Sequence, residues 1–170
     1  VVYATFQNIA KAYPWPLSAF ERASMARAAG WVAFGESVRD VLSAREGYGT
    51  PHRVIPPGVD VDRFHPDPDA GAAVRRRLGW PDAAAVVGFL GRFEPQKGLD
   101  DLMAALAQMR TPWRALFVGG GSMQAALEGF AKRYADRVQV IAGVAHGEVP
   151  AWLSAMSVLC APSRTTARWR

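Results

Sequence analysis

The sequence contains only one cysteine among its 170 residues, Cys160. A single cysteine excludes a framework of intrachain disulfide bonds and fits a reducing compartment, so we expect a cytoplasmic protein. Cys160 lies inside an apolar run at 157–161 with no histidine beside it, which favours a small buried residue over a nucleophile. No apolar stretch approaches the roughly 20 residues that a membrane-spanning helix needs.

Metal-binding and nucleic-acid-binding patterns are also lacking. The three histidines, His52, His65 and His146, show no metal-ligand spacing, and no Ser/His/Asp or Cys/His arrangement can be read from the sequence. We therefore predict that no metal is bound. The formal net charge of +5 favours anionic partners. The chain has no basic stripe with interleaved aromatic residues, which argues against nucleic acid as that partner.

Short apolar runs alternate with helical patterns along the chain, which predicts an α/β fold with right-handed crossovers and a parallel sheet. The segment PPGVD at 56–60 interrupts this alternation, because proline removes a backbone donor and glycine permits a sharp reversal. We place a domain boundary there, between residues 1–57 and 58–170. The expected strands are 1–6, 31–34, 53–55, 86–90, 114–118, 137–141 and 157–161, and the expected helices are 17–29, 38–46, 72–78, 99–109, 122–134 and 148–155.

The stretch 86–102 combines a strand, a cationic loop and a helix N-terminus. Its apolar run predicts a strand buried on both faces, which Gly91 ends. Arg92 and Lys97 stand in the following loop, and helical spacing resumes directly after it. A guanidinium fork and a mobile ammonium before a helix N-terminus suit a flexible diphosphate. The alternative is an ordinary strand-to-helix connection with two solvated cations.

Four acidic residues, in this loop or at the starts of expected helices, have structural explanations to weigh. Asp100 and Asp101 fall in the first turn of the expected helix, where the helix dipole favours anions. Glu148 is explained in the same way at a later helix. Glu94 stands between the two cations and either orients one of them or is solvated.

A glycine run, 119–121, follows one expected strand and precedes a helix. It is similar to a dinucleotide-binding fingerprint, but Gln124 stands where a third small residue is expected, which argues against a nicotinamide or flavin cofactor. The glycines either let the backbone approach a ligand or provide a tight turn. Loops that follow strands gather at one edge of a parallel sheet, where ligands bind. These loops are 91–98, 119–122, 143–147 and 162–170.

Six segments follow one another in the order and spacing of a known family. They are 54–60, 88–99, 118–121, 138–144, 150–153 and 161–163. Together they resemble the retaining, nucleotide-sugar-dependent glycosyltransferases of the GT-B fold, the group 1 (family 4) glycosyltransferases. The most specific part is the IPPGVD stretch followed by the loop with Arg92 and Lys97.

The resemblance implies two Rossmann-like domains, an N-terminal one for the acceptor and a C-terminal one for the donor. Residues 1–57 would end the first domain and 58–170 would form the larger part of the second. The family's motif of two glutamates, which contacts the donor sugar, would begin beyond Arg170. We therefore expect a central fragment that is inactive alone.

The resemblance also implies the site and its partners. Arg92 and Lys97 would hold the diphosphate of a nucleotide-sugar donor and stabilise the leaving group, with neither metal nor cofactor, and transfer would retain the anomeric configuration. The acceptor stays open among glycans, lipid-linked sugars and small molecules, as does peripheral contact with the inner membrane face. Because no catalytic acid or base is apparent, a non-catalytic nucleotide- or anion-binding module is the alternative. The donor-binding positions would be Gly91, Gly119, Gly120, Gly121, Gly143 and Val144.

Overall fold

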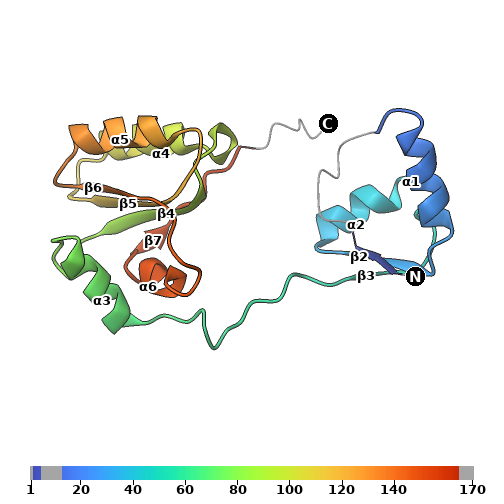
Figure 1. Ribbon diagram of the computed structural model, residues 1–170, viewed down its shortest axis with the longest axis horizontal. Coiled ribbons are helices and arrows are strands. Elements are labelled where there is room, and N and C mark those ends of the chain that lie inside the picture. Colours follow the sequence, from blue (N-terminus) through green and yellow to red (C-terminus); the bar gives the residue numbers. More distant parts are fainter. Residues whose placement is uncertain (1, 5–12, 165–170) are drawn as a thin grey trace. The chain divides into compact units, whose positions relative to one another are not determined.

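The computed structural model describes residues 2–4 and 13–164, and the chain forms two compact units, residues 1–59 and 60–170 (Figure 1). The division lies two residues beyond the expected boundary between 57 and 58. The acceptor and donor roles of the two parts stay predictions. Within the described residues, no helix is long and apolar enough to cross a membrane.

Unit 1 contains a three-stranded parallel sheet in the order β1-β2-β3. Trp31 and Leu42 lie in its core, and the Trp31 indole N–H donates to the Tyr48 carbonyl oxygen over 3.2 Å. The Tyr48 hydroxyl donates to the Glu21 carboxylate over 2.8 Å. Burial and this carboxylate raise the pKa of Tyr48 to about 12. The elements of unit 1 are β1 (Val2–Ala4), α1 (Leu17–Ala26), β2 (Gly30–Ala33), α2 (Glu36–Ser43) and β3 (His52–Val54).

Unit 2 is built on a four-stranded sheet in the order β6-β5-β4-β7, in which every neighbouring pair is parallel. The predicted parallel α/β fold is therefore confirmed. The strands are β4 (Val86–Arg92), β5 (Arg114–Gly120), β6 (Val138–Ile141) and β7 (Val158–Leu159). Residues 1, 5 and 6 of the expected first strand lie outside the described part of the chain.

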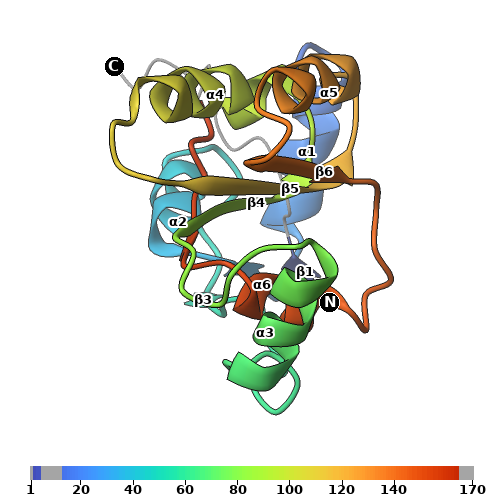
Figure 2. The same cartoon turned by 90° about the vertical axis from the view of Figure 1, so that its left-hand side faces the viewer.

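Helices cover both faces of this sheet (Figures 1 and 2). One face carries α4 (Leu99–Gln108) and α5 (Gln124–Arg133), and the other carries α3 (Pro68–Arg77) and α6 (Val149–Ser154). Side chains of β5 alternate between the two layers, as a strand with a repeat of two residues requires. Phe117 packs with the α4 and α5 side chains, and Leu116 packs with those of α3 and α6.

The start of α3 differs from the expectation. The sequence pattern predicted a helix over 72–78, whereas α3 begins at Pro68. The Asp67 carboxylate accepts a hydrogen bond from the Ala70 N–H over 2.9 Å and so caps the helix. Proline suits the first helical position, because its missing N–H would have no partner there. Asp67 therefore caps the start of α3, four residues before the start that the sequence pattern predicted.

Candidate functional site

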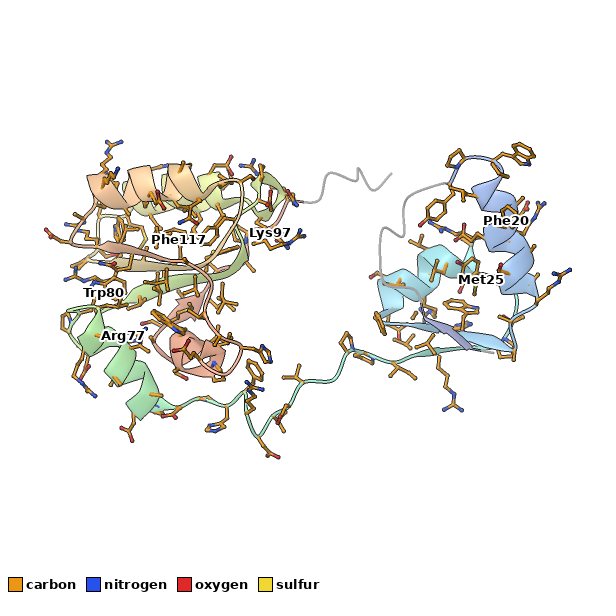
Figure 3. The ribbon with its side chains drawn as sticks, viewed as in Figure 1. Phe20, Met25, Arg77, Trp80, Lys97 and Phe117 are labelled. Atoms are coloured by element: carbon orange, nitrogen blue, oxygen red, sulfur yellow. The ribbon has the colours of Figure 1, made fainter. Side chains whose placement is uncertain are left out.

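The carboxyl ends of β4 and β5 lie side by side. The two strands pair in parallel register through to their last residues, so that Gly91 lies opposite Gly119 and Arg92 lies opposite Gly120. The sequence placed the end of the first strand at Gly91 and Arg92 in the loop, but β4 continues through Arg92 because Gly91 and Arg92 still pair with β5. The loop that carries Lys97 leaves the sheet next to the glycine loop, residues 119–122, whose first two residues are the end of β5. Figure 3 shows Lys97 at this end of unit 2.

The glycine loop packs directly against the cationic loop. The Phe93 N–H donates to the Gly120 carbonyl oxygen over 2.8 Å. A Cβ atom on Gly119 would stand 1.9 Å from the Gly91 carbonyl oxygen, and one on Gly121 would stand 2.5 Å from that of Phe93. Both glycines also have a positive φ, 147° and 152°. Gly119 therefore permits the close approach of the paired ends of β4 and β5, and Gly121 permits the close approach of the residue that follows β5 to Phe93. The sequence had suggested a tight turn or a ligand contact as the role of these glycines.

Glu94 forms no hydrogen bond or ion pair with Arg92 or Lys97 among the described residues. Its carboxylate accepts a hydrogen bond from the Ser122 hydroxyl over 2.7 Å and thereby joins the cationic loop to the glycine loop. Within the described part of the chain, no hydrogen bond or ion pair involves the side chain of Arg92 or of Lys97. The edge therefore presents two cations that are available to an anion.

The segment after β7 is fastened to the start of α4. Lys97 ends a short 3-10 turn (Pro95–Lys97), and Gly98 follows with a positive φ of 67°. A Cβ atom on Gly98 would stand 2.1 Å from the Pro162 carbonyl oxygen. The Arg164 N–H donates to the Gln96 carbonyl oxygen over 2.8 Å. The residues on both sides of Lys97 are thus held by the 162–164 segment.

Arg164 also pairs with the first turn of α4. Its Nε–H donates to Asp101 Oδ2 over 2.6 Å, and its Nη2–H donates to Asp100 Oδ2 over 2.9 Å. The Arg164 guanidinium lowers the pKa of Asp101 and has its own pKa raised by the two carboxylates. Sequence reasoning assigned the two aspartates to the helix dipole alone and missed this ion pair. The predicted loop 162–170 is described only as far as Arg164.

The predicted donor-binding residues Gly143 and Val144 lie in the loop 143–147, which follows β6. Val144 packs, partly buried, against the core on the α3 and α6 side. The His146 ring lies against the Phe64 ring, with 5.7 Å between the centroids. The Ala145 N–H donates to the Glu148 carboxylate over 3.3 Å, so the Glu148 side chain also ties the loop 143–147 to the start of α6. Gly143 has open space around the position of a Cβ atom.

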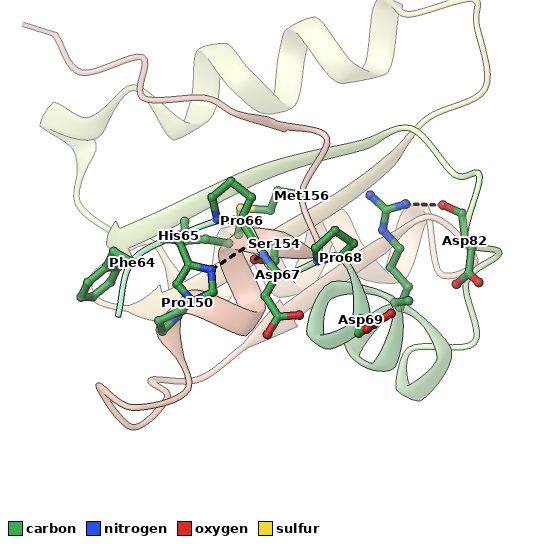
Figure 4. A pocket seen from close by; sticks show the side chains of 13 residues that line it. Phe64, His65, Pro66, Asp67, Pro68, Asp69, Asp82, Pro150, Ser154 and Met156 are labelled. Carbon is green, nitrogen blue, oxygen red and sulfur yellow. Dashed lines mark hydrogen bonds between the residues drawn. The ribbon is translucent and has the colours of Figure 1, made fainter. Parts of the chain in front are cut away.

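A cavity of about 730 Å³ lies elsewhere in unit 2, between α3, α6 and the segment that leads into α3 (Figure 4). Its lining does not include Arg92 or Lys97. Polar groups at its wall are engaged within the protein, since the Asp67 N–H donates to Ser154 Oγ over 3.1 Å and the Arg75 Nε–H donates to the Ala155 carbonyl oxygen over 2.9 Å. We therefore keep the candidate site at the strand ends.

Two further predictions concern cysteine and metal. Cys160 is half-buried and packs against the core cluster that includes Phe117, as a structural residue would. Among the residues that the structure describes, no three histidine, cysteine, aspartate or glutamate side chains lie close enough together to hold a metal ion.

The sequence and the fold of the chain are similar to those of several known proteins. The model of the family "Glycosyl transferases group 1" matches residues 84–169. A GDP-mannose-dependent alpha-(1-6)-phosphatidylinositol monomannoside mannosyltransferase of Mycolicibacterium smegmatis is 42% identical over 116 residues, which is 65% of this chain and 30% of the relative. The 2-deoxystreptamine glucosyltransferase of Streptomyces kanamyceticus is 32% identical over 156 residues, which is 86% of this chain and 40% of the relative.

Solved structures give the same fold. Sucrose-phosphate synthase from Thermosynechococcus elongatus superposes with a TM-score of 0.70 and 28% identity, over 86% of this chain and 38% of that one. Anabaena HepE in complex with UDP superposes with a TM-score of 0.77 and 22% identity, over 95% of this chain and 46% of that one. The chain thus spans less than half the length of these relatives, and the family match covers half of it. It belongs to the group 1 glycosyltransferases.

Proposed function

We propose that unit 2 holds the diphosphate of a nucleotide-sugar donor, and that the complete protein transfers the sugar to an acceptor with retention of the anomeric configuration. One observation carries the proposal. Arg92 and Lys97 stand at the carboxyl edge of a parallel sheet without a partner among the described side chains, next to a glycine loop. Ligands of such sheets bind at this edge.

The two cations fit the charge that develops during transfer. The bond between the anomeric carbon and its phosphate oxygen breaks, and the nucleoside diphosphate leaves with the electron pair. The acceptor hydroxyl oxygen forms the new bond to the same carbon, on the face that the phosphate leaves, and its proton passes to the departing phosphate oxygen. Fixed cations stabilise the negative charge on the leaving phosphate, so under this proposal neither a metal ion nor a cofactor takes part.

The relatives suggest which donors to test. GDP-mannose comes first, because the relatives at 41–42% identity are named as GDP-mannose-dependent. UDP-glucose comes second, because HepE has been solved in complex with it. The backbone of Gly143 and Val144 is our proposed contact for the nucleobase. Since the mycobacterial relatives are named for a phosphatidylinositol mannoside, a lipid-linked acceptor at a membrane surface is included in the proposal.

The test is a transfer assay on the full-length protein with both donors and a panel of acceptors. Arg92→Ala and Lys97→Ala each remove one charge-assisted contact, worth about 1.5–3 kcal/mol, so we expect activity to fall about tenfold or more. Lys132→Ala is the matched control, because Lys132 is an exposed lysine on α5. Undiminished activity in both variants would rule out the assigned role.

Two other outcomes separate parts of the proposal. An inverted anomeric configuration in the product, read by NMR, would refute retention while leaving the donor site intact. Donor binding without transfer in the full-length protein would favour the non-catalytic nucleotide-binding module.

A further inference from the structure

The amino edge of the sheet in unit 2 carries a second group of cationic side chains. The loops that lead into β4, β5 and β6 surround a cavity of about 630 Å³. Its charged lining residues are Arg110, Arg114, Arg137 and one carboxylate, Asp136. Figure 3 shows Trp80, which lies just before this edge in the chain, and Lys97 at opposite ends of unit 2.

Two of the three guanidinium groups lie over aromatic rings. Arg114 lies 5.9 Å from the centroid of the Trp80 ring, and Arg137 lies 5.7 Å from that of Trp113. Stacking occupies the face of a guanidinium and leaves its in-plane N–H donors free. No ion pair or side-chain hydrogen bond of the three arginines is found within residues 2–4 and 13–164. Asp136 supplies one negative charge against the positive charges of three arginines, so the cluster has an excess of positive charge.

Trp113 provides an independent observation. Its side chain lines the same cavity and is only 4% exposed, and its indole N–H is buried without a hydrogen-bond partner among the described residues. Buried donors in folded proteins are nearly always paired, and an unpaired one calls for an explanation. The cavity wall thus combines Trp113, whose buried donor is unpaired among the described residues, with three arginine side chains against one carboxylate.

We propose that this cavity, the amino-edge site, binds a small phosphate ester at a place separate from the donor diphosphate. The arginine forks match phosphate oxygens, since guanidinium and phosphate form paired charge-assisted hydrogen bonds. Pro81, Ala83 and Pro112 supply apolar wall for the organic part of the ligand. The volume lies within the range of about 300–1,000 Å³ that is typical of small-molecule sites. The inference does not rest on the proposed function.

A soluble phosphate ester and the headgroup of an anionic phospholipid offer the same phosphate group. The test therefore has two arms, both with the full-length protein carrying Arg92→Ala and Lys97→Ala to silence the donor site. One arm titrates glycerol 3-phosphate by calorimetry. The other measures co-sedimentation with vesicles of phosphatidylcholine containing phosphatidylglycerol, against vesicles of phosphatidylcholine alone.

Arg110→Ala combined with Arg137→Ala removes two cations of the amino-edge site. We expect binding in at least one arm, and we expect this double variant to raise the Kd about tenfold or more. Arg53→Ala is the control, because it removes an exposed arginine from β3 in the other unit. The arm that shows binding identifies the source of the phosphate. Failure to bind in both arms, or equal binding with and without Arg110 and Arg137, would overturn the proposal.

Discussion

Replacing Gly119 by alanine should disrupt the contact between the paired ends of β4 and β5 at the candidate site. The new Cβ atom would stand 1.9 Å from the Gly91 carbonyl oxygen and 3.2 Å from Cε1 of Phe93. An L side chain is also strained at the φ of 147°, by about 1–3 kcal/mol. Forcing extra volume into a packed site costs about 1–3 kcal/mol more. We therefore expect Gly119→Ala to lower the free energy of unfolding by about 2–6 kcal/mol.

Gly120→Ala is a matched control one residue along. No atom lies within 4 Å of the position that its Cβ atom would take. We expect a change of less than about 0.5 kcal/mol, as for most exposed substitutions. Urea unfolding followed by tryptophan fluorescence measures both variants against the wild type. Equal stability of Gly119→Ala and Gly120→Ala would refute the argument that close packing fixes the glycine loop.

Three further predictions concern a helix cap, a buried phenol and an ion pair. Asp67→Ala should lower the free energy of unfolding by about 0.5–2 kcal/mol in urea titrations, while Asp69→Ala, which removes no cap and loses only its interaction with the helix dipole, should lower it less. The pKa of Tyr48 is raised from 10.0 to about 12, so the protonated phenol stabilises the fold fully below pH 10, and this stabilisation is lost between pH 10 and 12. Thermal unfolding of Tyr48→Phe across this pH range should not show that loss. Arg164→Gln should raise the pKa of Asp101 toward its ordinary value in an NMR titration, and an unchanged pKa would contradict the ion pair.

Much of the fold can be predicted from short apolar runs and glycine positions. The run at 86–90 predicts β4 because its residues pack into layers on both faces of the sheet, and the run at 114–118 predicts β5 for the same reason. Parallel strands end at one edge, so the placement of Arg92 and Lys97 beside the glycine loop followed from topology. The order and spacing of the apolar runs were therefore enough to predict that the two cations lie at the carboxyl edge of the sheet.

Contacts between distant residues could not be predicted in this way. Glu94 and Ser122 are 28 residues apart, and Arg164 and Asp101 are 63 apart, so their meeting depends on strand register and loop path. Local spacing carries no information about either. The start of α3 is a different case, because an aspartate before a proline is a known helix-start signal that the proline-rich surroundings of Asp67 obscured.

The central claim is that Lys97, with Arg92, holds the donor diphosphate. Calorimetric titration of the full-length protein with GDP tests it most directly, with UDP as the second ligand. We predict a Kd about tenfold or more higher for Lys97→Ala than for the wild type, because one charge-assisted contact is lost, and an unchanged Kd for Lys132→Ala. Equal affinities of the Lys97→Ala and Lys132→Ala proteins for both nucleotides would contradict the claim.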